Sequence, residues 1–150
     1  MIEISLLLHT LAAVLWVGGM FFAYTIVRPN MVLLDPPLRL TLWRAVLQRF
    51  FNWVWLFVVL LPVTGLYLVH AVFAGFASAP WHVYIMFVLA VVMIAVFVYV
   101  FFVPYKTLCL EVEKSEWQQA AAALNRIRQL VAVNLVLGIT IISVVMLARY

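Results

Sequence analysis

Long apolar runs, separated by short segments that carry the charged residues, dominate the chain. No residue between Glu3 and Arg28 is charged, residues 50–105 carry no charge, and residues 129–148 form a third uncharged run. About 20 apolar residues are enough to cross the hydrocarbon core of a bilayer as a helix, so the middle run is long enough for two crossings. The pattern predicts four membrane-spanning helices, which cover about residues 4–27, 51–75, 81–103 and 125–148.

The composition is typical of an integral membrane protein, because 69% of the residues are apolar and only 9% are charged. Backbone polar groups inside hydrocarbon require a helix or a closed barrel, and the alternating strands of a barrel are absent from the sequence. The first run opens with Glu3 and is too long for the core of a signal peptide, so we expect it to remain as a helix. We therefore predict an all-α fold, an up-down-up-down four-helix bundle that forms a single domain over residues 1–150.

The basic residues are distributed unevenly along the chain. Eight of the nine flank the connections from the first span to the second and from the third to the fourth: Arg28, Arg39, Arg44, Arg49, Lys106, Lys114, Arg126 and Arg128. Short connections rich in Lys and Arg remain in the cytoplasm. Both termini and the connection at 75–81 are therefore predicted to face outward, into the periplasm of a Gram-negative bacterium. We expect a protein of the inner membrane with lipid around it, and dispersed basic residues beside membrane ends do not indicate a nucleic-acid partner.

The inward connections carry a helix signal of their own. Asp35 is followed by two prolines, which is typical of a helix start, and the sequence predicts an interfacial helix at about residues 37–49.

Cys109 is the single cysteine, so a disulfide within the chain is excluded and no role is assigned to it.

All three histidines fall in the predicted outward half of the membrane. His9 and His70 each lie about five residues inside the outer end of their span, which corresponds to a shared depth of about 7 to 8 Å. His82 begins the third span and lies nearer the surface. An ionisable side chain inside a membrane is costly and marks a functional site by default. The matched depths make His9 and His70 the leading candidates for one shared site.

Two metal chemistries fit these histidines. In the first, His9 and His70 are the axial ligands of haem b, held between facing helices. Trp16 shares the helical face of His9, and Tyr67 shares that of His70, so both are predicted to line the cofactor. Arg149 would then lie near the haem propionates.

In the second chemistry, copper is bound by imidazole and thioether groups. His82 and Met86 are four residues apart on the third span and join His9 and His70 as candidate metal ligands. Met93 lies on the same stripe as Met86, and its role stays open. A structural subunit without a cofactor is a third interpretation. The sequence contains no constellation suited to zinc hydrolysis and no phosphate-binding loop.

Several segments resemble the CopD domain family, the membrane part of bacterial copper-resistance proteins. LHTLAAVLWVGGMFF, residues 8–22, resembles its first helix, in which a histidine is followed by a tryptophan and glycines. LLPVTGLYL at 60–68, PWH at 80–82 and LNRIRQLVAVNLVLG at 124–138 are also similar to that family. The resemblance implies copper passage or uptake across the inner membrane.

The first helix is also similar to that of the HemJ-type protoporphyrinogen oxidases, which bind haem b through a histidine that His9 matches. Their third helix has a lysine shortly after its tryptophan, whereas WHVYIMFVLA, residues 81–90, contains none. This departure argues against the oxidase activity and leaves open whether the protein is an enzyme.

We therefore expect a haem b protein that mediates one-electron transfer with a quinone or a periplasmic redox partner through His9 and His70. Copper binding or uptake, with a periplasmic copper-carrier protein as partner, is the alternative, and a cofactor-free structural subunit is the third. The sequence leaves the oligomeric state open, a homo-oligomer included.

Overall fold

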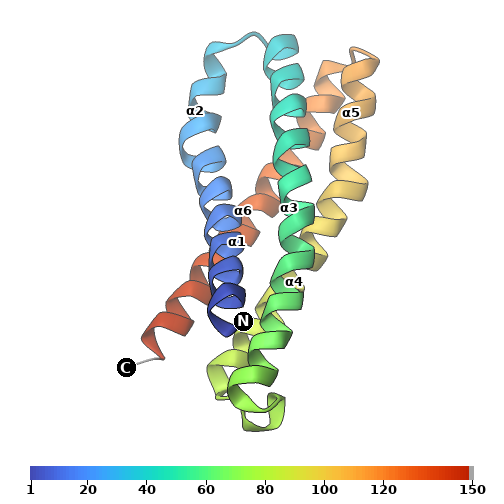
Figure 1. Cartoon of the computed structure of the whole chain (residues 1–150). Coiled ribbons are helices and arrows are strands. Elements are labelled where there is room, and N and C mark those ends of the chain that lie inside the picture. Colours follow the sequence, from blue (N-terminus) through green and yellow to red (C-terminus); the bar gives the residue numbers. More distant parts are fainter. Residues whose placement is uncertain (149–150) are drawn as a thin grey trace.

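The computed structural model describes residues 1–148 and consists of four long helical rods joined by short connections (Figure 1). The first rod is a succession of four elements: α1 (Ile2–Phe22), η1 (Ala23–Val27), α2 (Arg28–Asn30) and η2 (Met31–Leu33). The second rod is one helix, α3 (Pro36–Phe73). A short 3-10 turn, η3 (Phe76–Ser78), leads to the third rod.

The third rod comprises α4 (Trp81–Val100), η4 (Phe101–Tyr105) and α5 (Lys106–Glu113), and the fourth rod is α6 (Trp117–Leu147). Each rod is long and apolar enough to cross a membrane, and residues 1–148 contain no strand. The predicted all-α fold with four spanning helices is therefore confirmed. The chain is a multi-pass membrane protein.

The second rod differs from its prediction in one respect. The sequence indicated a separate interfacial helix at about 37–49, whereas α3 runs without a break from Pro36 to Phe73. No glycine or proline occurs between Pro37 and Pro62, so nothing in that interval ends the helix. The predicted interfacial segment is the first part of α3.

Prolines coincide with π-helical turns in two rods. η1 ends two residues before Pro29, and η4 contains Pro104. A proline inside a helix removes one backbone hydrogen bond and its ring collides with the carbonyl four residues earlier. A π turn widens the helix locally and accommodates that conflict. Both rods therefore continue past their prolines.

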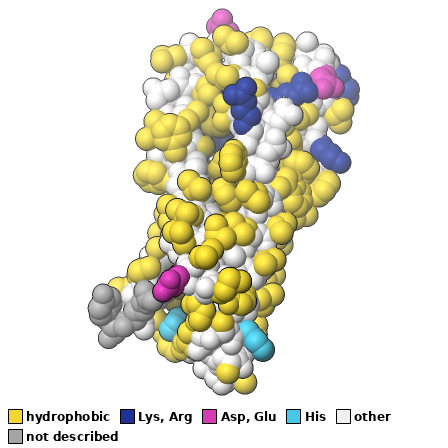
Figure 2. Space-filling view, in the orientation of Figure 1, with side chains coloured by type: hydrophobic (Ala, Val, Ile, Leu, Met, Phe, Trp, Pro, Cys, Tyr) yellow, Lys and Arg dark blue, Asp and Glu magenta, His cyan; other side chains and the backbone are white. Residues whose placement is uncertain are grey.

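The Lys and Arg side chains and the histidine side chains lie toward opposite ends of the rods. In the face shown in Figure 2, Lys and Arg lie toward the upper end and His toward the lower end. We name these the basic end, which carries Arg28, Arg39, Arg44 and Arg128, and the histidine end, which carries the three histidines. Which end faces the cytoplasm stays a prediction, for which the basic residues favour the basic end.

Aromatic side chains close the interior between the middle of the bundle and the basic end. We name this set the aromatic cluster: Trp16, Phe51, Trp55, Phe97, Phe101 and Tyr105. Phe51 lies at its centre, with its ring centroid 5.5 Å from that of Phe97 and 5.0 Å from that of Tyr105, both edge to face. Edge-to-face pairs at such distances are favourable. The cluster joins the first, second and third rods.

Polar side chains are scarce inside the bundle. Among the described residues the buried polar side chains are Thr64 and Asn134. The Asn134 amide donates a hydrogen bond from Nδ2 to the Met93 carbonyl, at 3.0 Å, and so joins α6 to α4. Such bonds help to hold helices together in lipid, where burial of apolar surface gives little driving force.

Candidate functional site

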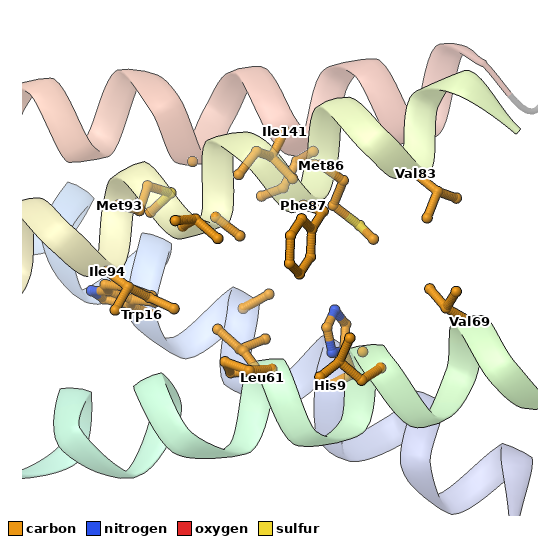
Figure 3. A pocket seen from close by; sticks show the side chains of 18 of the residues that line it. His9, Trp16, Leu61, Val69, Val83, Met86, Phe87, Met93, Ile94 and Ile141 are labelled. Carbon is orange, nitrogen blue, oxygen red and sulfur yellow. The ribbon is translucent and has the colours of Figure 1, made fainter. Parts of the chain in front are cut away.

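A cavity of about 270 Å³ lies at the histidine end, between all four rods. Its walls come from α1, α3, α4 and α6, with Phe76 of η3 beside them, and they are almost entirely apolar. Figure 3 shows His9 on one side of this cavity and Met86 and Phe87 on the other. The cavity is therefore an apolar chamber with an imidazole in its wall.

Two glycines in the cavity wall, Gly65 and Gly138, allow close packing of the helices around it. A Cβ on Gly65 would come within 3.1 Å of Cε1 of His9, so the absence of a side chain there gives room for the imidazole against α3. A Cβ on Gly138 would lie 2.6 Å from a methyl carbon of Val17, so Gly138 allows α6 to approach α1 closely. Small residues at helix contacts permit such approach in membrane bundles.

His9 is held by one hydrogen bond across the bundle. Its Nδ1 lies 2.9 Å from Oγ1 of Thr64. The Thr64 hydroxyl donates its proton to the Leu60 carbonyl, at 2.6 Å, as threonines on helices often do. A hydroxyl has only one proton to donate, so both bonds form together only in the tautomer in which the His9 Nδ1–H donates to Oγ1. Nε2 then carries the lone pair, and Figure 3 shows the nitrogen away from α3 facing the cavity.

Two methionines of α4 line the same cavity. Met86 is half-buried, and in Figure 3 its sulfur points into the cavity from the side opposite His9. Met93 is buried and lies deeper along the same helix. The cavity therefore brings an imidazole nitrogen and two thioether groups into one apolar space.

The other predicted site residues are placed differently. Trp16 is buried and lines the cavity. His70 and Tyr67 are exposed on α3, and neither His70 nor Tyr67 lines the cavity. His82 is half-buried beside the Trp81 ring and also lies outside the cavity wall. Arg149 falls outside the described residues.

The pair predicted to ligate haem b is therefore not assembled. A macrocycle needs axial ligands on opposite faces, whereas His70 points away from the cavity that His9 lines. The cavity is also smaller than the usual 300 to 1,000 Å³ or so of a ligand pocket. Within residues 1–148 no group of three or more His, Cys, Asp or Glu side chains is placed to hold a metal. The geometry does not support the haem interpretation.

Thr64 is the site residue that the sequence interpretation missed. It lies in the LPVTG segment, one position before Gly65, and its hydroxyl is the partner of His9. A hydroxyl residue in an otherwise apolar span was the available signal, because polar side chains in such spans tend to bond across helices.

The fold and the cavity define a multi-pass helical membrane protein with a candidate soft-metal site at one end. The family model "Copper resistance protein D" (CopD) matches residues 44–148, which is well over half of the chain. The chain therefore belongs to the CopD family, as its resemblance indicated. No curated protein and no solved structure matches it. A relation to the HemJ-type oxidases is not shown.

The matched region includes part of the site. Thr64, Met86 and Met93 lie within residues 44–148, whereas His9 precedes them. The family match therefore covers three of the four rods over most of their length, and the role of the first rod depends on the geometry of the cavity.

Proposed function

We propose that the protein binds copper(I) as a cargo in the cavity beside His9, as a step in copper uptake across the inner membrane. The observation that carries the proposal is that His9, Met86 and Met93 all line one apolar cavity, with the Met86 sulfur facing it from the side opposite His9. Imidazole and thioether groups are soft donors that suit copper(I). Membership of the copper-resistance family supports the same metal.

The chemistry of the cavity favours copper(I) over harder cations. Calcium and magnesium require six or more oxygen ligands, and the cavity wall offers none from a carboxylate. Copper(I) is a singly charged soft ion, so its burial among neutral ligands costs less than that of a divalent ion. The predicted orientation places the cavity on the periplasmic side, where a copper-carrier protein could deliver the ion.

Thr64 has a positioning role in this proposal. Its hydroxyl accepts the Nδ1 proton of His9 and so leaves Nε2 free to bind the metal. Metal-binding histidines commonly donate their second ring N–H in this way, and loss of the partner weakens metal binding about 10- to 100-fold. Thr64→Val should weaken binding within this range, whereas Thr64→Ser keeps the hydroxyl and should bind nearly as well as the original protein.

The experiment is a copper(I) titration of the purified protein in neutral detergent, in competition with a coloured copper(I) chelator. His9→Ala should abolish binding to the protein, and Met86→Leu should weaken it with little loss of stability, because Leu has a similar volume. His70→Ala is the matched control, since His70 is exposed outside the cavity. X-ray absorption at the copper edge should show nitrogen and sulfur ligands together.

Two results would contradict the proposal. The first is an equal loss of copper(I) with His70→Ala and His9→Ala. The second is a protein that binds no copper and remains folded, which would favour the structural-subunit interpretation. A purified protein with a Soret band would restore the haem interpretation.

A further inference from the structure

Four arginines at the basic end are half-buried, and only one of them has an acidic partner. Arg44 bonds from Nη2 to Oε1 of Glu113 at 2.6 Å. The other three are Arg28, Arg39 and Arg128. Within residues 1–148, none of these three has a carboxylate oxygen within 4.0 Å. No carboxylate in the described part of the chain therefore neutralises their positive charges.

The three unneutralised arginines come from three different rods. Arg28 follows the π turn of the first rod, Arg39 lies near the start of α3, and Arg128 lies on α6. Arg28 and Arg39 both lie close enough to Arg128 for their charges to act on its guanidinium group. Like charges held together repel unless an anion lies between them.

Two contacts hold these guanidinium groups in place. Arg28 lies over the Tyr24 ring, with Cζ 4.9 Å from the ring centroid. Arg128 donates from Nη2 to Oδ1 of Asn125 at 3.0 Å. The Nε of Arg128 is buried and has no hydrogen-bond partner. A buried N–H without an acceptor is costly, so this position calls for an acceptor from outside the chain.

We propose that Arg28, Arg39 and Arg128 bind the phosphate group of one anionic phospholipid at the basic end. Phosphate oxygens accept the paired N–H groups of guanidinium well, and basic pockets between transmembrane helices bind lipid headgroups. The position along the rod is suitable. Arg28 lies 24 residues after the predicted start of the first span at residue 4, which is about 36 Å along a helix. That is just beyond a hydrocarbon core of about 30 Å, at headgroup level.

The surroundings favour a lipid over a free phosphate ion. Ile26 and Leu38 lie within two residues of Arg28 and Arg39, and their side chains are 47% and 57% exposed. The acyl chains of a phospholipid can cover this apolar surface while its phosphate group contacts the arginines. Inorganic phosphate has no apolar part and would leave the surface uncovered.

The test is native mass spectrometry of the full chain in a non-ionic detergent, titrated separately with phosphatidylglycerol and phosphatidylcholine. The original protein should retain one phosphatidylglycerol more tightly than phosphatidylcholine. Arg128→Gln should weaken phosphatidylglycerol binding about fivefold, the effect expected for loss of one basic residue near a headgroup. Arg126→Gln is the matched control, because Arg126 is on the same helix but exposed, and it should change binding less than about twofold.

Further variants keep the test decisive. Arg128→Lys retains the charge but loses the paired N–H donors of the guanidinium group. Its affinity for phosphatidylglycerol should therefore lie between those of the original protein and Arg128→Gln. If Arg128→Gln has a lower thermal unfolding midpoint by circular dichroism, Arg39→Gln replaces it, with the same expected loss. Equal effects of the 126 and 128 variants, or equal binding of the two lipids, would overturn the proposal. Displacement of phosphatidylglycerol by inorganic phosphate at the same concentration would overturn the lipid assignment.

Discussion

Around Phe51 the rods are closed by interlocking rings, whereas around His9 the same rods leave a cavity of about 270 Å³. Trp16 belongs to both regions, since it lines the cavity and packs edge to face on Phe97 with centroids 6.3 Å apart. It forms the boundary between them. The difference indicates that one region holds the rods together and thereby leaves the other open for a ligand.

The comparison has an energetic basis in lipid. Apolar side chains gain little by leaving a lipid environment, so contact between well-fitted side chains contributes most of the attraction between spans. The aromatic cluster supplies such contact, and the cavity wall supplies little. We therefore expect substitutions in the aromatic cluster to affect stability most, and substitutions in the cavity wall to affect copper binding most.

The largest effect on stability is expected at Phe51. This side chain is 2% exposed and packs on three rings of the third rod, so Phe51→Ala should destabilise the protein by about 3 to 5 kcal/mol. The measurement is the free energy of unfolding in a mixed-micelle titration with dodecyl sulfate. Trp53→Ala is the control, because Trp53 is 59% exposed toward lipid. Equal losses of unfolding free energy in Phe51→Ala and Trp53→Ala would show that the aromatic cluster is no more important for stability than a lipid-facing ring.

A smaller effect is expected at Gly65. The Cβ of Gly65→Ala would stand 3.1 Å from Cε1 of His9, so the imidazole must shift by a few tenths of an ångström. We expect a loss of about 1 kcal/mol in stability, at the low end of overpacking costs, together with weaker copper(I) binding. Gly18→Ala is the matched control, since nothing lies within 4 Å of its Cβ position. Unchanged copper(I) binding in the Gly65 variant would show that copper is not bound in the cavity beside His9.

The smallest effect on stability is expected at Ala90, in the cavity wall on α4. Ala90→Leu adds apolar volume to an open space, so the free energy of unfolding should change by less than about 1 kcal/mol. Copper(I) binding should nevertheless fall strongly, because the added side chain fills part of the cavity that His9 also lines. The chelator competition assay measures this, and retention of full affinity would show that copper is bound elsewhere.

The fold was largely predictable, because the length of an uncharged apolar run determines whether it can cross a bilayer as a helix. Membership of the copper-resistance family followed from the resemblance of several segments, of which those at 60–68, 80–82 and 124–138 lie within the family match. The merging of the interfacial helix into α3 was missed, because the composition changes near Arg49 although the backbone does not break there.

The direction in which each side chain points could not be predicted in the same way. His70 shares the predicted depth of His9, yet its side chain is exposed, while its neighbour Val69 lines the cavity. In a soluble helix the polar face reveals the outside. In lipid both faces are apolar, so the sequence of α3 does not distinguish the cavity side from the lipid side.

The unbroken second rod links the two ends of the molecule mechanically. α3 has 38 residues and is therefore about 57 Å long, more than the 40 to 45 Å or so of a bilayer with its headgroups. It must tilt or protrude, and the tilt of a spanning helix depends on membrane thickness. Arg39 and Thr64 are both in α3, so a change in the tilt of this helix moves both residues. We therefore expect the spacing between Thr64 and His9 to respond to the thickness of the membrane around the protein.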